Sequence, residues 1–247
     1  MTSEHIVKSF DDDLRQIESL ITQMGGLVET QITDALTALT RHDQTLGQKV
    51  LENDTRIDDL ELEVDSAVVR IIALRQPKAQ DLRAVIAVLK AAANLERIGD
   101  YAKNIAKRAS VLGDTRSIGS SHNVLKSMSR IVQEMLKDVL DAYVERDIKM
   151  ADQVRLRDED VDQLHNTLFR ELLTYMMEDP RSITPCMHLL FIAKNIERMG
   201  DHTTGIAEQV HYIIAGAVPE QERPKGDVTS LTTLNPDQAK RSNSATP

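Results

Sequence analysis

Cysteine and aromatic residues are scarce in this sequence of 247 residues. The one cysteine, Cys186, cannot form a disulfide within the chain, and a metal site built from several thiolates is excluded. Such cysteine usage is typical of a protein in the reducing cytosol. Tryptophan does not occur, and Phe, Trp and Tyr together make up 3% of the residues, whereas aliphatic residues are plentiful. This balance favours helices packed through aliphatic side chains over β-sandwiches, which depend on aromatic and β-branched residues.

Long apolar runs are missing too. The stretch from Met1 to Asp13 is polar and acidic, unlike a signal region, and no run of about 18 apolar residues occurs. We therefore expect a cytoplasmic protein that reaches a membrane only through its partners. The formal net charge of −9 opposes nucleic acid as a main partner, because phosphate binding needs a basic surface. It suits cations or a basic patch on another protein.

Signatures of nucleophilic catalysis are also missing. The sequence holds no glycine-rich phosphate loop, no Gly-x-Ser-x-Gly elbow and no visible Ser/His/Asp set. Because nothing in it makes a persuasive nucleophile, we expect a protein that is not an enzyme.

What the sequence does contain is helical periodicity, with apolar residues recurring in steps of three and four over six long stretches. Gln76-Pro77 and Asp179-Pro180 end a stretch in each half, because proline ends a helix and can open the next. Ser182 is the expected N-cap of the last helix. We predict an all-α protein of two tandem antiparallel three-helix bundles related by an internal repeat. Its predicted parts are a first bundle over 1–113, a second over 114–218, and a disordered tail over 219–247.

One phrase occurs twice, once in each predicted bundle. Asn94-Leu95-Glu96-Arg97-Ile98-Gly99-Asp100 returns as Asn195-Ile196-Glu197-Arg198-Met199-Gly200-Asp201. In each copy Glu and Asp are four residues apart, so their carboxylates lie one turn apart on the same helix face. Like charges at this spacing repel by about 0.2–0.5 kcal/mol unless something positive lies between them.

The acidic pairs continue the apolar seams of their helices. The two seams are Leu82, Val85, Leu89 and Ala92, which lead to Glu96, and Ile183, Met187, Leu190 and Ala193, which lead to Glu197. Both motifs are therefore expected on or beside a face that packs against a neighbouring helix, where charge is costly unless something compensates it. A cation, an arginine or exposure at the bundle edge would provide the compensation.

Carboxylate clusters bind hard or borderline divalent ions, and the sequence leaves iron, zinc, manganese and magnesium open. The first face has a third oxygen ligand in Asn104, whereas Gly205 stands at that place in the second repeat. The candidate metal ligands are Glu96, Asp100, Asn104, Glu197 and Asp201, with Asp58, Glu61, Asp65, Asp162 and His165 as weaker candidates.

Three alternatives compete with a regulatory metal site. In the first, the acids pair with Arg97 and Arg198, which recur in register with them, and bind no metal. In the second, the chain is a carboxylate-bridged metalloenzyme, a hydrolase or oxidase, although no general acid or base recurs with the motif. In the third, it is a helical scaffold without a ligand.

The two three-helix repeats, each with Glu-Arg-Ile/Met-Gly-Asp on its third helix, resemble the PhoU family of bacteria. The similarity runs from Met24-Gly25-Gly26 through Arg75-Gln76-Pro77 and the segment Thr174–Asp179 to Asp201, and leaves out the tail. The resemblance implies a cytoplasmic, all-helical, homodimeric regulator of phosphate uptake and phosphate homeostasis. In that role it would restrain the phosphate-starvation response through a phosphate-sensor histidine kinase and the ATPase subunit of the phosphate ABC transporter.

The resemblance also implies iron or zinc clusters on the acidic motif. Position by position, the ligand role falls on Glu96, Asp100 and Asn104 in the first repeat and on Glu197 and Asp201 in the second. Because Gly205 departs from the longer Glu-x-x-x-Asp-x-x-x-Asn form, we expect the second site to be weaker or differently completed.

Overall fold

All regular secondary structure in the described part of the chain is helical. The computed structural model describes residues 2–112, 121–220, 225–227 and 229, and only the backbone of residues 2–9. The helices are α1 (Thr2–Arg41), α2 (Gln44–Arg75), α3 (Gln80–Ala109), α4 (Ser121–Glu145), α5 (Ile148–Glu178) and α6 (Ile183–Ala215), with a short 3-10 turn, η1 (Pro180–Ser182), before the last. None of these helices is both long and apolar enough to cross a membrane.

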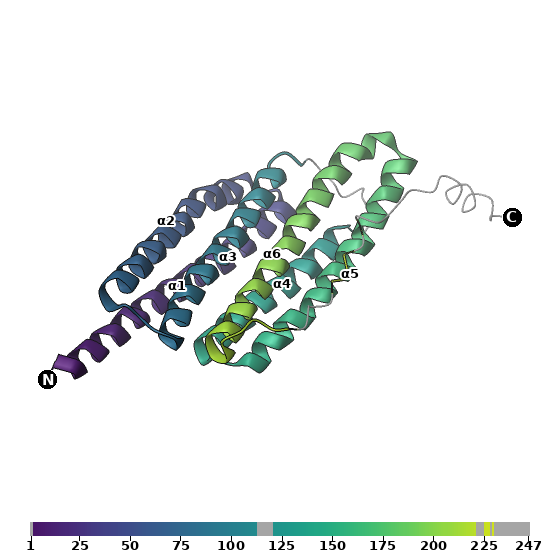
Figure 1. Ribbon diagram of the computed structural model, residues 1–247. Coiled ribbons are helices and arrows are strands. Elements are labelled where there is room, and N and C mark those ends of the chain that lie inside the picture. Colours follow the sequence, from purple (N-terminus) through teal and green to yellow (C-terminus); the bar gives the residue numbers. More distant parts are fainter. Residues whose placement is uncertain (1, 113–120, 221–224, 228, 230–247) are drawn as a thin grey trace.

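The helices form two antiparallel bundles of three, as Figure 1 shows. Helices α1, α2 and α3 pack against one another, and so do α4, α5 and α6. The prediction of an all-α fold with two repeated three-helix units is therefore confirmed. The predicted boundary between 113 and 114 lies outside the described residues, so the exact domain limits stay a prediction.

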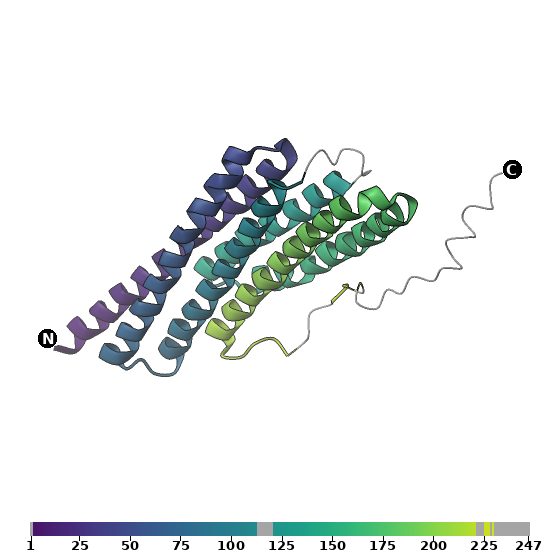
Figure 2. The same ribbon diagram turned by 90° about the horizontal axis from the view of Figure 1, so that it is seen from above.

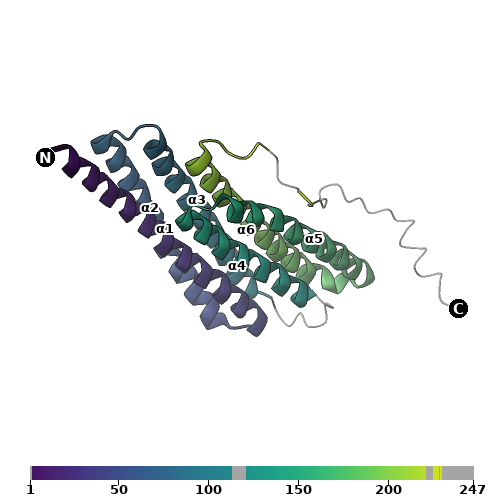
Figure 3. The same cartoon turned by 90° about the horizontal axis from the view of Figure 1, so that it is seen from below.

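The two bundles lie side by side and share one apolar core. Helix α3 packs along α6, and α1 packs along α4 (Figures 2 and 3). At the second contact the Gly25 backbone lies so close to Leu140 that an added Cβ would be 2.6 Å from its Cδ1 atom. Gly25 therefore marks a close helix–helix approach, whereas a Cβ on Gly26 would meet nothing within 4 Å.

The helix ends follow from local chemistry. Asp43 caps α2 by accepting a hydrogen bond from the Leu46 amide at 2.9 Å, and Asp147 caps α5 through the amides of Lys149 and Met150. Ser182 occupies the predicted N-cap position of α6 but does not cap it. Its hydroxyl instead donates to the carbonyls of Tyr175 and Asp179, because η1 turns the chain just before the helix begins.

The seams that lead to the acidic motifs are only partly buried. Ile183 and Met187 are 44% and 40% exposed, and Leu82 is 38% exposed, so the prediction of a buried seam was wrong at these three positions. Helix α6 packs against α3, α4 and α5 together, and the centre of its buried face is therefore shifted by one residue from the predicted seam. That face is formed by Cys186, Leu189, Ile192, Ala193, Ile196 and Met199.

Part of the predicted disordered tail is described. Gly226 and Asp227 form hydrogen bonds with residues of α5 and α6, and Thr229 bonds to Asp227. Figure 1 draws these tail residues in yellow. Residues 221–224, 228 and 230–247 lie outside the described residues, and there the prediction of disorder remains untested.

The glycine pair of α1 provides a test of the packing between the bundles. We expect Gly25→Val to lower the free energy of unfolding by about 1–3 kcal/mol, because the new side chain would overlap Leu140. Gly26→Val is the matched control, since nothing lies within 4 Å of a Cβ at that position. Chemical denaturation of both variants measures the difference, and equal stabilities would contradict the close contact.

Candidate functional site

The first acidic motif is organised around the ammonium group of Lys103. This group donates to Asp100 Oδ1 at 2.6 Å, one turn away on α3, and to Asp54 on α2. The Asp54 carboxylate is only 6% exposed and also accepts a hydrogen bond from Gln31 Nε2 on α1 at 3.0 Å. Gln31 Nε2 further contacts the Gly99 carbonyl at 3.1 Å. One polar network thus joins all three helices of the first bundle.

Carboxylates gather around this network at spacings that disfavour full ionisation. Burial, followed by the charge of Asp100 and a hydrogen bond to it, raises the pKa of Glu96 to about 7. Burial and neighbouring acids also raise the pKa of Asp58 and of Glu61. Burial would raise the pKa of Asp100 as well, but the hydrogen bond and charge of Lys103 outweigh it and lower the pKa. Below about pH 7, this balance favours a protonated Glu96 beside an ionised Asp100.

The arginines of the repeated phrase have different roles. Arg97 lies 3.4 Å from Glu96 and 3.6 Å from Asp100, but its side chain is 59% exposed, so solvent screens the attraction. Arg198 forms a hydrogen bond with Tyr101 of α3, which raises the pKa of its guanidinium. The salt bridges of Lys103 to Asp100 and of Lys194 to Glu197 are therefore shorter than those of Arg97 to Glu96 and Asp100.

The second motif is more deeply buried and uses a different lysine. Glu197 is 5% exposed, and Lys194 Nζ on the preceding turn of α6 donates to its Oε1 at 2.8 Å. Burial raises the pKa of Glu197 despite this partner, and no hydrogen bond reaches its Oε2 from the described residues. Asp201 lies half-buried one turn further along α6.

The weaker candidates of the second repeat contact the tail. Asp162 Oδ2 accepts a hydrogen bond from the Gly226 amide at 2.7 Å. His165 is 3% exposed, with Nδ1 3.7 Å from Asp227 Oδ1. Burial lowers the pKa of His165, and the opposing effect of the Asp227 charge is smaller. The same Asp227 carboxylate accepts from Lys194 at 2.8 Å, so a tail residue completes the second cluster.

The glycine of the repeated phrase sets the distance to the neighbouring helix. A Cβ on Gly99 would lie 3.0 Å from Ile57 Cδ1 of α2, and a Cβ on Gly200 would lie 2.6 Å from Asp158 Oδ1 of α5. Ile57 and Asp158 thus occupy the same place in the two repeats. The glycine is needed because the motif helix passes its neighbour too closely for a side chain.

The predicted difference between Asn104 and Gly205 has a packing explanation. A Cβ on Gly205 would lie 2.8 Å from Oδ1 of Asn94, the first residue of the repeated phrase on α3. The same oxygen lies 2.9 Å from His202 Nδ1 of α6. Gly205 is therefore the point where the first motif helix presses against the second.

One cavity beside the bundles touches the first motif. It measures about 450 Å³ and lies between α2, α3 and α6. Its lining consists of Glu61, Lys90, Ala93, Asn94, Glu96, Arg97, His202, Gly205, Glu208 and Gln209. Glu96 and its neighbour Glu61 are therefore accessible from outside.

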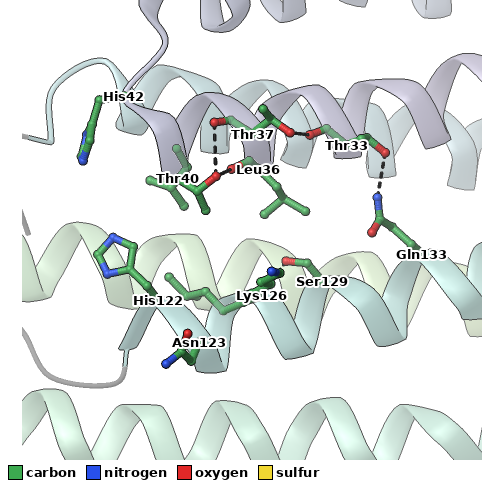
Figure 4. A pocket seen from close by; sticks show the side chains of 12 residues that line it. Thr33, Leu36, Thr37, Thr40, His42, His122, Asn123, Lys126, Ser129 and Gln133 are labelled. Atoms are coloured by element: carbon green, nitrogen blue, oxygen red, sulfur yellow. Dashed lines mark hydrogen bonds between the residues drawn. The ribbon is translucent and has the colours of Figure 1, made fainter. Parts of the chain in front are cut away.

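A larger cavity of about 670 Å³ lies between α1 and α4, away from both motifs (Figure 4). The Thr33, Thr37 and Thr40 hydroxyls on its wall donate to carbonyls of their own helix, and Gln133 Nε2 donates to Thr33 at 2.8 Å. No residue of an acidic motif lines it. The cavity is therefore not the predicted site.

A metal ion would have to rearrange either motif. Within the described ranges, no three side chains of His, Cys, Asp or Glu are grouped closely enough to hold a metal ion as they stand. The donor chemistry of the first motif nevertheless fits a divalent cation, since Asp54 and Asp100 share one ammonium group and Glu96 is hydrogen-bonded to Asp100. Glu208 and His211 have Glu-x-x-His spacing, but His211 Nε2 lies 2.8 Å from Asp152.

The structure brings together most, but not all, of the predicted site residues. One cluster contains Glu96, Asp100, Asp58 and Glu61, and Asp65 is exposed at its margin. The cluster of the second repeat contains Glu197, Asp162 and His165. Sequence reasoning missed Gln31, Asp54, Lys103, Lys194 and Asp227. The spacing of three between each lysine and a motif acid was a signal for two of them.

Fold and sites together define a class of all-helical proteins with two copies of a three-helix unit, each carrying an acidic motif. The PhoU domain family matches residues 21–109 and 125–210, which are the two repeats. The chain therefore belongs to the PhoU family, as its sequence motifs predicted.

Similar proteins cover almost the whole chain. A phosphate-specific transport system accessory protein PhoU homolog of Caulobacter vibrioides is 48% identical over 92% of this chain and 99% of the relative. The Rhizobium meliloti homolog is 46% identical over 93% and 97%. The crystal structure of PhoU from Pseudomonas aeruginosa is 40% identical with a TM-score of 0.81, covering 84% of this chain and all of that one.

A structure with lower sequence identity has the same fold. The phosphate transport system regulatory protein PhoU from Streptococcus pneumoniae is 28% identical with a TM-score of 0.80, and it covers 86% of this chain. These relatives are named as accessory and regulatory proteins, so the family supports the prediction of a protein that is not an enzyme.

The raised pKa of Glu96 predicts a pH dependence of stability in metal-free protein. The folded state holds this proton more tightly than the unfolded chain, so the contribution is complete below the ordinary pKa of 4.5 and lost as pH rises through about 7. When the pH rises from 5 to 8, the free energy of unfolding of Glu96→Gln should therefore increase by about 1–3 kcal/mol relative to that of the wild type. Denaturation in chelator at both values measures it, with Glu63→Gln, an exposed acid of α2, as control. Parallel pH profiles for wild type and Glu96→Gln would contradict the assignment.

Proposed function

We propose that this protein is a cytoplasmic negative regulator of phosphate uptake and of the phosphate-starvation response. The observation that carries the proposal is the match of both repeats to one family, with relatives of the same extent named for the phosphate-specific transport system. In this proposal it couples the ATPase subunit of the phosphate ABC transporter to the phosphate-sensor histidine kinase, acting as a homodimer. Two long bundles with charged outer faces suit an adaptor, because they offer extended surfaces to two partners.

Deletion of the gene tests the regulatory role. In high phosphate, the deletion strain should express phosphate-starvation genes, because the kinase would no longer receive the signal that uptake is sufficient. Reporter expression measures this, and complementation with the intact gene should restore repression. Full repression in a clean deletion, in a genome without a second copy, would contradict the proposal.

We also propose that the first motif binds a divalent cation, of which manganese, iron, zinc and magnesium are candidates. Asp54, Glu96 and Asp100 would supply the ligands, with Glu61 and Asn104 within one or two turns, Asp58 in the same cluster and Asp65 at the margin. The raised pKa of Glu96 supports this, because a carboxylate that resists ionisation among other acids gains most from an added positive charge. The cavity beside Glu61 and Glu96 supplies access. Glu197 and Asp201 would form the corresponding second site.

Lysine substitution distinguishes this proposal from simple acid–lysine pairing. If Lys103 occupies the cation position, Lys103→Met should bind Mn²⁺ about tenfold more tightly than the wild type, because two carboxylates lose their partner. Lys107→Met is the matched control, since Lys107 lies one turn further along α3 and is exposed. Calorimetric titration measures the affinities, and Glu96→Ala/Asp100→Ala should abolish binding. Equal affinities for the two lysine variants would contradict competition between lysine and metal.

A further inference from the structure

The second repeat has a surface that binds an acidic, glycine-containing segment, and the chain's own tail occupies it. Both main-chain polar groups of Gly226 are bonded to α5. Its amide donates to Asp162 Oδ2 at 2.7 Å, and its carbonyl accepts a hydrogen bond from Asn166 Nδ2. Asp162 and Asn166 are four residues apart and only 4% and 8% exposed, so they present one donor and one acceptor on a single face.

The next tail residue, Asp227, forms a salt bridge with the surface. Asp227 Oδ2 accepts from Lys194 Nζ at 2.8 Å, and this ammonium also holds Glu197. Asp227 Oδ1 accepts from the amide and hydroxyl of Thr229, which fixes the turn of the segment. The bonds from Lys194 and Thr229 lower the pKa of Asp227 even though burial opposes the change, so the carboxylate stays charged.

The tail residue that touches α5 has to be small. A Cβ on Gly226 would lie 3.1 Å from the Cβ of Asp162, which is tighter than an ordinary contact, and 3.8 Å from Cγ of Glu159. A side chain at this position would therefore crowd the helix at the point where the Gly226 backbone makes its two hydrogen bonds. The segment therefore fits the surface through its glycine as well as through its charge.

The internal repeat shows what the same surface looks like without a tail. Ile57 and Asp158 occupy equivalent places, and the same register pairs Glu61 with Asp162 and Ala93 with Lys194. In the first repeat Glu61, Ala93 and Glu96 line the open cavity of about 450 Å³. In the second repeat the equivalent residues Asp162, Lys194 and Glu197 instead bond to the tail or to one another.

We propose that the tail residues Gly226, Asp227 and Thr229 form a cap on the acidic motif of the second repeat. The cap covers the surface that stays open in the first repeat, so the two motifs differ in their access to cations. A cation reaches Glu197 only after Asp227 has released Lys194. The docking of the cap is independent of the function proposed above, whereas its effect on cations rests on that function.

Glycine-selective ¹⁵N labelling of the full-length protein tests both parts in one sample, because the chain has only ten glycines. The Gly226 amide, bonded to Asp162, should exchange with solvent at least about tenfold more slowly than a free peptide. Asp227→Ala should remove this protection. The matched control is Glu220→Ala, because Glu220 is an exposed acid in the preceding chain. Free-peptide exchange of Gly226 in the wild type would overturn the cap.

Mn²⁺ added to the same samples reports on access, because Gly99 and Gly200 each precede the aspartate of one motif. In the wild type, Mn²⁺ should broaden the Gly99 signal at lower concentrations than the Gly200 signal. In Asp227→Ala, the Gly200 signal should broaden at about fivefold lower concentrations than in the wild type, since the competent state is no longer capped.

The remaining outcomes separate the two proposals. If Gly226 is protected but Gly200 broadens equally in wild type and Asp227→Ala, the cap does not restrict cations, and that part is overturned. If Mn²⁺ broadens neither Gly99 nor Gly200 at any concentration, the cation function is overturned together with the restriction. Slow exchange of Gly226 would in that case still establish the docked segment.

Discussion

A lysine ammonium between carboxylates is the interaction on which both acidic motifs depend. Each motif lies where a helix packs against its neighbours, and the acids that the lysines bind include Asp54 and Glu197, which are too buried to be solvated by water alone. Lys103 joins Asp54 to Asp100, and Lys194 joins Glu197 to Asp227. Removing one partner of such a pair destabilises the fold, because the other charge is left uncompensated. The lysines thus allow an acidic cluster to exist inside a bundle without a bound metal.

This constraint explains how one phrase produces two different sites. The glycine before its final aspartate lets the motif helix approach α2 in one repeat and α5 in the other. The charge that compensates the acids comes from after the motif in the first repeat and from before it in the second. In the first repeat the lysine binds a second helix, and in the second it binds the tail. The first motif is consequently open to a cavity, while the second is covered.

The fold could be predicted from the sequence because its signals are long and repeated. Apolar periodicity over stretches of 25 or more residues, and prolines at corresponding places, specify helices and their turns with little ambiguity. The seam of α6 was misplaced by one residue because that helix packs against three others, so its buried face is wide. The packing of α6 against α3 also explains Gly205, because a side chain at this position would overlap Asn94 of the other repeat.

The partners of the site could be predicted only in part. Glu96, Glu197 and their aspartates were recognisable from the repeated phrase. The two lysines could have been predicted as well, because side chains three residues apart on a helix are neighbours. Asp54 lies on another helix, and Gln31 on a third, so no local pattern connects them with Asp100. Asp227 was hidden in a segment whose composition is typical of disorder, because its order depends on hydrogen bonds made by α5 and α6.

Crystal structures of the protein prepared with chelator and with Mn²⁺ test most directly whether lysine and metal compete for the same carboxylates. In the chelated protein, Lys103 Nζ should lie between Asp54 and Asp100. With Mn²⁺, an anomalous peak should appear among Asp54, Glu96 and Asp100, and Nζ should have moved out of hydrogen-bonding distance of both aspartates. A manganese ion bound there with Lys103 unmoved, or a peak confined to other parts of the protein, would contradict the account.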